Sequence, residues 1–160
     1  MKFMQARWVL FLILASIITI SGCGGELSAK DGDTVSVHYT LRLADGTVIQ
    51  TSVGSDPYQF TIGSSGTISG FSQAVIGMKP GESKTVEIPA DDAYGPYDED
   101  LVYIVNRDDL PSDLELEVGQ WYQAYSFTVI EISASTVTLD YNHPLAGKDL
   151  TFDIELVEIL

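Results

Sequence analysis

Apolar and polar side chains alternate along the part of the chain that follows the N-terminal segment. Residues 34–44 carry an apolar side chain at every second position, which predicts a strand with one buried face. The apolar positions are Val35, Val37, Tyr39, Leu41 and Leu43, and the polar ones between them are Ser36, His38, Thr40 and Arg42. Asp45-Gly46 then predicts a tight turn, with residues 47–52 as the returning strand of a hairpin.

The same pattern predicts two more strands and one short helix. Tyr58, Phe60 and Ile62 alternate with polar residues up to Gly63, and residues 83–88 form another strand. Between them, apolar residues fall at helical spacing over residues 70–77, and the turn of residues 79–82 closes this helix. The sequence therefore predicts an α+β, mostly β domain, in which a bent antiparallel sheet packs its concave face against one short helix.

The rhythm changes between residues 98 and 140. Here we expect a strand over residues 101–105, then two long strands over residues 122–132 and 136–141. The alternation of the first part returns only over residues 150–156, which read as its missing last strand. We interpret residues 98–140 as a β-rich insertion into a domain made of residues 31–97 and 141–160.

The N-terminus has the order of an export signal. Lys2 and Arg7 precede an apolar run from Trp8 to Ile20, which is shorter than the roughly 20 residues of a membrane-spanning helix. Residues 1–22 are therefore expected to be a signal peptide, and residues 23–30 a flexible tether. Ile20-Ser21-Gly22-Cys23 resembles the lipobox of lipoproteins, so Cys23 is the expected lipidation site of a protein anchored to the outside of the cell membrane. A plain signal peptide and an uncleaved signal anchor are the alternatives.

The charge of the chain limits its partners. Beyond Cys23 there are six basic and 23 acidic residues, and six minus 23 gives a formal charge of −17. Such a surface repels nucleic acid, so we expect no nucleic-acid binding. No zinc-ligand spacing, phosphate-binding glycine motif or nucleophile elbow occurs in the sequence, and we expect neither a cofactor nor a bound metal.

Five short motifs follow one another along the chain: Val37-His38-Tyr39-Thr40, Pro57 to Gly63, Ile68-Ser69-Gly70-Phe71, Ala93-Tyr94-Gly95 and Leu150 to Leu156. Together they resemble the FKBP-type peptidyl-prolyl isomerases, in the SlyD-like form that carries a chaperone domain inserted in its flap. The resemblance covers nearly everything after Lys30. It implies the FKBP fold and catalysis of cis–trans isomerisation at X-Pro peptide bonds, with unfolded or partly folded proline-containing polypeptides as partners of a monomeric enzyme.

The resemblance also implies a site, an aromatic cup that grips proline. Catalytic roles are expected for Tyr94, Phe152, Tyr39, Ile49 and Gln50, and substrate-binding roles for Tyr58, Thr67, Ile68 and Phe71. The family usually has an acid where this chain has Gln50, which puts catalytic efficiency in doubt. Without the resemblance, most of these aromatic residues could equally belong to the core of a small sheet protein.

The inserted segment has more apolar side chains than so small a unit is expected to bury. Val102, Ile104, Leu110, Trp121, Tyr125, Phe127 and Val129 are examples. We expect some of them to form an exposed patch that binds unfolded chains, and about half to form the segment's own core. The main hypothesis is an extracytoplasmic isomerase with a chaperone domain that assists the folding of exported proteins. The alternatives are a non-catalytic chaperone or peptide-binding module and, well behind it, a surface adhesion domain.

Overall fold

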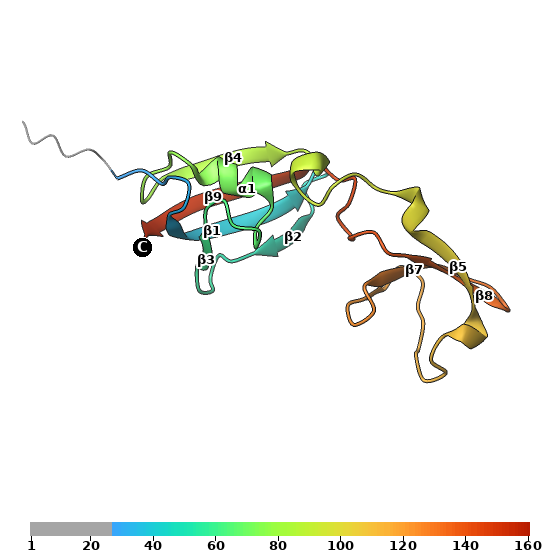
Figure 1. Ribbon diagram of the computed structural model, residues 1–160. Coiled ribbons are helices and arrows are strands. Elements are labelled where there is room, and N and C mark those ends of the chain that lie inside the picture. The colour runs from blue at the N-terminus through green and yellow to red at the C-terminus, as the bar shows by residue number, and fades with distance from the viewer. Residues whose placement is uncertain (1–26) are drawn as a thin grey trace, which may run out of the picture.

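The computed structural model describes residues 27–160, which form two lobes connected by two chain segments (Figure 1). The predicted signal peptide and Cys23 lie outside the described residues. None of the helices between residues 27 and 160 has the length and apolar character that crossing a bilayer requires.

The first lobe is built on a five-stranded antiparallel sheet in the order β2-β1-β9-β4, with β3 also paired to β1. Its strands are β1 (Thr34–Leu43), β2 (Val48–Thr51), β3 (Tyr58–Thr61), β4 (Ser83–Ile88) and β9 (Leu150–Ile159). The helix α1 (Ser69–Val75) packs against the sheet and contacts β4 and β9 (Figure 1). It is the one α-helix among residues 27–160, so the predicted fold class is confirmed.

The second lobe is built on a four-stranded antiparallel sheet in the order β5-β8-β7-β6. Its strands are β5 (Val102–Asn106), β6 (Trp121–Tyr122), β7 (Phe127–Ile132) and β8 (Thr136–Asp140), with short 3-10 turns at η2 (Glu99–Leu101) and η3 (Arg107–Asp109). A further 3-10 turn, η1 (Ala90–Asp92), follows β4 in the first lobe. β4 and β9 are paired side by side in the first sheet. The chain between these two strands forms the whole second sheet.

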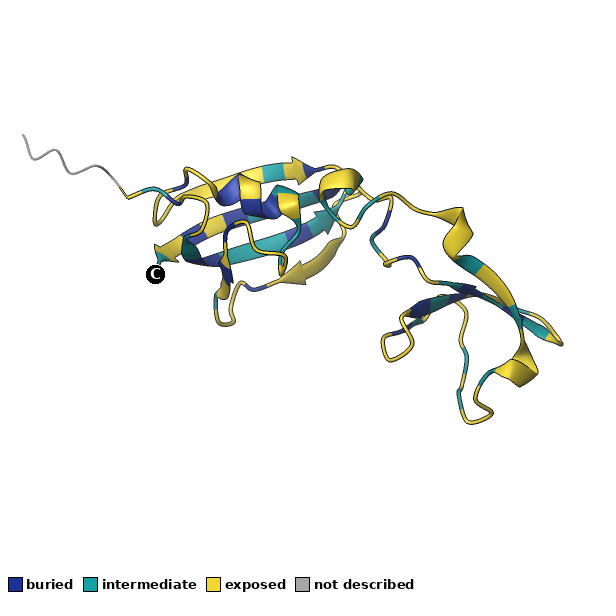
Figure 2. Ribbon diagram, in the orientation of Figure 1, coloured by how far each residue is buried: buried dark blue, intermediate teal, exposed yellow. Residues whose placement is uncertain are grey.

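Each lobe has its own hydrophobic core, seen as separate buried regions in Figure 2. The first core joins the inward positions of β1 and β9 to the apolar face of α1, including Val37, Val75 and Ile154. The second core is smaller and consists of Tyr122, Phe127, Val129, Val137 and Leu139. Because so few residues are buried there, hydrophobic burial stabilises the second lobe less than the first.

Two local expectations were wrong. The single long strand over residues 122–132 is broken into β6 and β7 by a turn in which Ser126 has φ 57°, and the Tyr125 N–H donates to the Tyr122 carbonyl at 3.0 Å. Tyr122 is held at this turn because its hydroxyl donates to the Glu115 carbonyl and accepts from the Glu117 N–H. In β1, Ser36 is buried although it lies on the polar side of the strand, beside an irregularity in the pairing with β9 between residues 36 and 37.

Candidate active site

A cavity of about 610 Å³ lies on the side of the first sheet against which α1 packs. It is enclosed by β1, β2, β3 and β9, by the segment that enters α1, and by the turn after η1. The lining residues are Tyr39, Leu41, Gln50, Tyr58, Ser65, Gly66, Thr67, Ile68, Ser69, Phe71, Ala93, Tyr94 and Phe152. Eight of the nine residues predicted for the site are among them.

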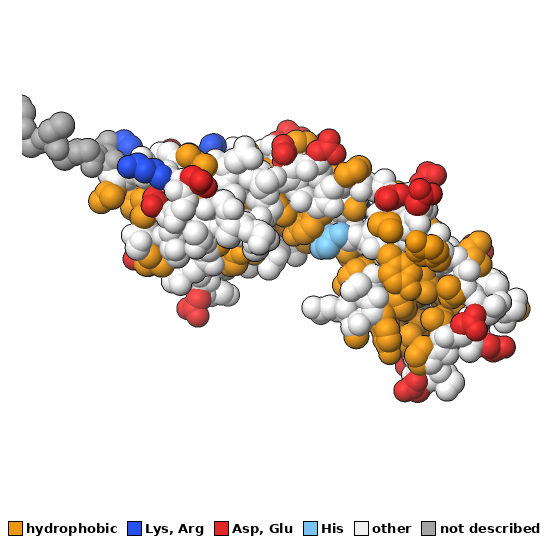
Figure 3. Space-filling view, viewed as in Figure 1, with side chains coloured by type: hydrophobic (Ala, Val, Ile, Leu, Met, Phe, Trp, Pro, Cys, Tyr) orange, Lys and Arg blue, Asp and Glu red, His pale blue; other side chains and the backbone are white. Residues whose placement is uncertain are grey.

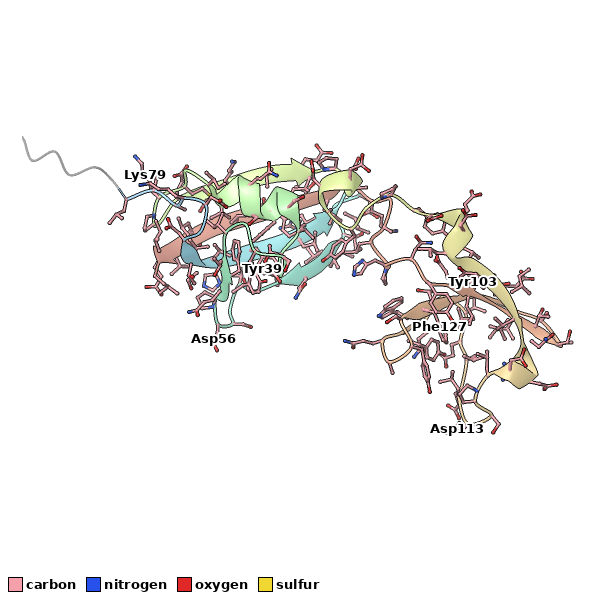
Figure 4. The ribbon with its side chains drawn as sticks, viewed as in Figure 1. Tyr39, Asp56, Lys79, Tyr103, Asp113 and Phe127 are labelled. Carbon is pink, nitrogen blue, oxygen red and sulfur yellow. The ribbon has the colours of Figure 1, made fainter. Side chains whose placement is uncertain are left out.

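Three aromatic rings form the floor of the cavity. Phe71 and Phe152 are 3% and 5% exposed, with ring centroids 5.0 Å apart in an edge-on arrangement. The ring of Tyr39 lies 5.7 Å from Phe71 and 6.1 Å from Phe152, and Figure 4 shows it in the first lobe beside α1. Each ring is fixed by the other two, so the floor presents a preformed apolar surface.

The rim of the cavity is more polar. Tyr58 and Tyr94 are 37% and 39% exposed, and the Tyr58 hydroxyl lies 3.0 Å from the Thr67 hydroxyl. Ile68, just before α1, is half-buried and packs against the first core. Tyr94 reaches the rim from the opposite side, because the Gly95 N–H donates to the Ala90 carbonyl at 2.8 Å and so curls the chain after η1.

Two tyrosine hydroxyls of the site, those of Tyr39 and Tyr94, have a raised pKa that favours their protonated, hydrogen-bond-donating form. Burial, and then the neighbouring Tyr58, raises the pKa of Tyr94 above its ordinary value. Burial likewise raises the pKa of Tyr39, with smaller contributions from Tyr58 and Tyr94. Among the described residues, those that line the cavity include no acid, lysine, cysteine or histidine. The cavity therefore offers an apolar floor with neutral hydrogen-bond donors at its edge.

Ile49 does not line the cavity, contrary to the expectation. It is 44% exposed on β2, whereas the next residue, Gln50, does line the cavity. Adjacent residues of a strand point to opposite faces, so both cannot face the same cavity. Gln50 pairs with Leu41 of β1 and brings a neutral amide to the position where the family resemblance leads one to expect an acid.

His143 stacks on Tyr94, a contact that the sequence analysis missed. The two rings are nearly parallel, at 2°, with centroids 3.8 Å apart. No pattern in the sequence connects these two residues, because 49 positions and the whole second lobe separate them.

The second lobe has a row of aromatic rings beside its core. Tyr103 lies edge-on to Tyr141 at 5.7 Å, Tyr141 lies 5.8 Å from Phe127, and Phe127 lies 5.8 Å from Tyr125. Phe127 is buried, while the three tyrosines are 40–49% exposed. We call these four residues the aromatic row; Figure 4 labels Tyr103 and Phe127.

Of the apolar residues noted in the insertion, Phe127 and Val129 are buried, and Val102, Leu110 and Trp121 are half-buried. Tyr125 and Ile104 are exposed, Ile104 by 73%. Part of this set is therefore core and part is surface, as expected.

Comparison with known proteins agrees with this geometry. Residues 25–157 match the FKBP-type peptidyl-prolyl cis-trans isomerase family. The chain is 37% identical over 147 residues to a short-type peptidyl-prolyl cis-trans isomerase of Methanocaldococcus jannaschii, covering 81% of this chain and 93% of that protein. It is 36% identical to the FKBP-type peptidyl-prolyl cis-trans isomerase SlyD of Treponema pallidum, over 75% of this chain and 72% of the relative. A 16 kDa FKBP-type isomerase of Escherichia coli is 33% identical, over 82% of this chain and 94% of its own length. The chain belongs to the family of FKBP-type peptidyl-prolyl cis-trans isomerases.

Proposed function

We propose that this enzyme isomerises X-Pro peptide bonds of exported, incompletely folded polypeptides, and that its second lobe holds those polypeptides near the active site. The observation that carries the first half of the proposal is the preformed floor of Tyr39, Phe71 and Phe152 in an open cavity free of charged groups. A proline ring is apolar and compact, and such a floor suits it.

The chemistry needs no nucleophile. Rotation about a peptide bond is slow because partial double-bond character imposes a barrier of roughly 18–20 kcal/mol. The twisted transition state has lost amide resonance and is less polar than either planar isomer. A water-poor aromatic floor therefore favours the transition state over the planar ground states. The hydroxyl of Tyr94, at the rim, is placed to donate a hydrogen bond to a peptide carbonyl and fix one side of the rotating bond.

The aromatic row supports the second half of the proposal. Hydrophobic side chains gather on the visible face of the second lobe, over β5, β7 and β8 (Figure 3). The exposed tyrosines of the row provide large apolar surfaces with polar tips, which suits binding of unfolded chains of varied sequence. The high negative charge of the chain keeps a protein with such a surface soluble.

We propose an extracytoplasmic location, with the chain attached to the cell membrane through a lipid on Cys23. The charged start, the apolar run and the Ser21-Gly22-Cys23 sequence support this part of the proposal. Mass spectrometry of the protein from membranes tests it: a diacylglyceryl adduct on an N-terminal Cys23 is expected, and an unmodified thiol or an intact residue 1 would contradict it.

The test of the enzyme uses residues 24–160 and a short X-Pro peptide. Phe152 is also a core residue, and its replacement by alanine would cost about 3–5 kcal/mol of stability, so we use Tyr94→Ala combined with Phe152→Leu. Tyr103→Ala, which removes an exposed aromatic ring of the second lobe, is the matched control. We expect acceleration that the double substitution abolishes and the control retains. A folded wild-type protein without activity would favour the non-catalytic peptide-binding module instead.

The test of the second lobe replaces residues 98–140 by a short loop. Isomerisation of the short peptide should persist, whereas suppression of aggregation of an unfolded protein should weaken. Because deletion removes a whole lobe, a milder variant with Tyr103→Ser and Tyr125→Ser, both exposed, should weaken the same activity without unfolding the lobe. Unchanged binding of an unfolded protein in both variants would refute the division of labour.

A further inference from the structure

The ring of His143 covers one face of Tyr94 at the rim of the cavity, and the contact is closer than ring attraction alone would set. Aromatic pairs usually settle offset or edge-on, with centroids about 4.5–7 Å apart. Here the centroids are 3.8 Å apart and the planes differ by 2°, so the rings almost overlay. Such an arrangement indicates that the surrounding backbone holds the two rings together.

His143 is fixed by the turn that it begins. The Ala146 N–H donates to the His143 carbonyl at 2.8 Å, and the Leu145 N–H donates to His143 Nδ1 at 3.1 Å. Since Nδ1 accepts that bond, the ring proton of the neutral side chain lies on Nε2. Partial burial lowers the pKa of His143, which favours this neutral form. The half-buried Leu145 packs against the first core and seats the turn on the first lobe.

Further contacts hold the segments that carry the two rings side by side. The Gly147 N–H donates to the Gly95 carbonyl at 2.8 Å, directly after Tyr94. A Cβ on Gly147 would lie 3.0 Å from the Cβ of Tyr97 and 3.2 Å from its backbone nitrogen, so a larger residue would push the two segments slightly apart. Two residues further on, the Asp149 carboxylate accepts the Ala90 N–H at 3.0 Å.

We infer that His143 is a positioning residue of the isomerase, which holds the ring of Tyr94 in place at the rim so that its hydroxyl meets the substrate carbonyl. This inference rests on the proposed role of the cavity and assigns a function to a residue outside its lining. A Tyr94 side chain on a turn, 39% exposed, would otherwise be free to leave the rim by rotation about its side-chain bonds. Removing the stacked ring should therefore lower the fraction of enzyme that is ready to react.

Three substitutions of His143 distinguish the effect of its aromatic ring from the effect of its Nδ1 hydrogen-bond acceptor. His143→Ala removes both, His143→Phe keeps a ring without the Nδ1 acceptor, and His143→Asn keeps a polar group without a ring. We expect kcat/KM on a short X-Pro peptide to fall about two- to tenfold in His143→Ala and His143→Asn, and to recover largely in His143→Phe. In a Tyr94→Ala background, His143→Ala should have no further effect, since the two residues act through one contact.

A spectroscopic measurement distinguishes failure of this inference from failure of the proposed activity. The His143 ring current should shift the ring protons of Tyr94 upfield in the NMR spectrum of the wild type, and the shift should vanish in His143→Ala and persist in His143→Phe. Full kcat/KM in a folded His143→Ala variant would overturn the inference, as would an additive loss in the Tyr94→Ala background. An inactive wild type with the ring-current shift present would refute the proposed activity and, with it, the role of the contact in turnover.

Discussion

Replacing Asn142 should destabilise the second lobe while leaving the first lobe folded. Asn142 is 5% exposed and joins the two segments that connect the lobes. Its Oδ1 accepts the Asp98 N–H at 2.9 Å, and its Nδ2 donates to the Asp98 carbonyl and to Asp140 Oδ1, both at 2.8 Å. Asn142→Ala removes all three bonds and leaves their partners partly buried.

The magnitude follows from these three bonds. A hydrogen bond contributes about 0.5–1.5 kcal/mol net, so the loss of three should cost about 1.5–4.5 kcal/mol, with a central value of about 3 kcal/mol. A unit of about forty residues has a total stability of roughly 2–6 kcal/mol at typical values per residue. The loss is therefore about half or more of the stability of the second lobe. The first lobe, with its larger core, should be little affected.

The assay uses a natural probe. Trp121 is the one tryptophan in residues 24–160, and it lies on β6 of the second lobe, so its fluorescence during urea unfolding reports that lobe. Hydrogen exchange of peptides from β1 and β9 reports the first lobe. The matched control is Asn106→Ala, which removes an exposed hydrogen bond to Asp109 and should cost less than about 0.5 kcal/mol. An unchanged Trp121 midpoint, or equal destabilisation of both lobes, would refute the reasoning.

Two further predictions concern Gln50 and Asp153. Gln50→Asp should raise kcat/KM on a short X-Pro peptide severalfold. The reason is that a carboxylate accepts hydrogen bonds from the tyrosine hydroxyls of the same cavity more strongly than an amide does. An unchanged or lower kcat/KM would contradict this prediction. The hydroxyl of Thr85, donating at 2.7 Å, and then Arg42 lower the pKa of Asp153 in the folded state. Its contribution to stability is therefore complete above the unfolded pKa, near pH 4, and is lost as the pH falls through the lower folded pKa. Asp153→Asn should flatten the acid side of a plot of unfolding free energy against pH, and an unaltered slope below pH ~4 would contradict the assignment.

The sequence predicted the strands whose alternation reflects one buried face. In β3, β4 and β9, and in β1 apart from Ser36, the apolar period matches the structure, since these strands cover one side of a core. It did not predict the break between β6 and β7, because Tyr122, Phe127 and Val129 all favour strands. The turn there depends on Ser126 at positive φ and on the tertiary hydrogen bonds of Tyr122.

The cavity could be predicted only through resemblance to the family, because periodicity alone places Tyr39, Phe71 and Phe152 in a core. The alternation of side chains along a strand does place Ile49 and Gln50 on opposite faces of β2. This rule alone predicts that only one of the two residues can line the cavity. The contact between Tyr94 and His143 could not be predicted, because it arises from how the chain returns after the second lobe.

The start of the folded chain limits how far the enzyme can reach if Cys23 is lipidated as proposed. The Ala29 N–H donates to the Met78 carbonyl at 2.8 Å, and the Gly77 N–H donates to the Ala29 carbonyl, so Ala29 is already part of the first lobe. Ala29 is six positions after Cys23, and at 3.3–3.6 Å per residue this stretch spans at most about 22 Å. The described chain begins at the end of the first lobe that lies away from the second lobe (Figure 1). The anchored protein would therefore stay in a thin layer next to the membrane, with its second lobe farthest from the membrane. Its effective concentration would be highest toward polypeptides within that layer.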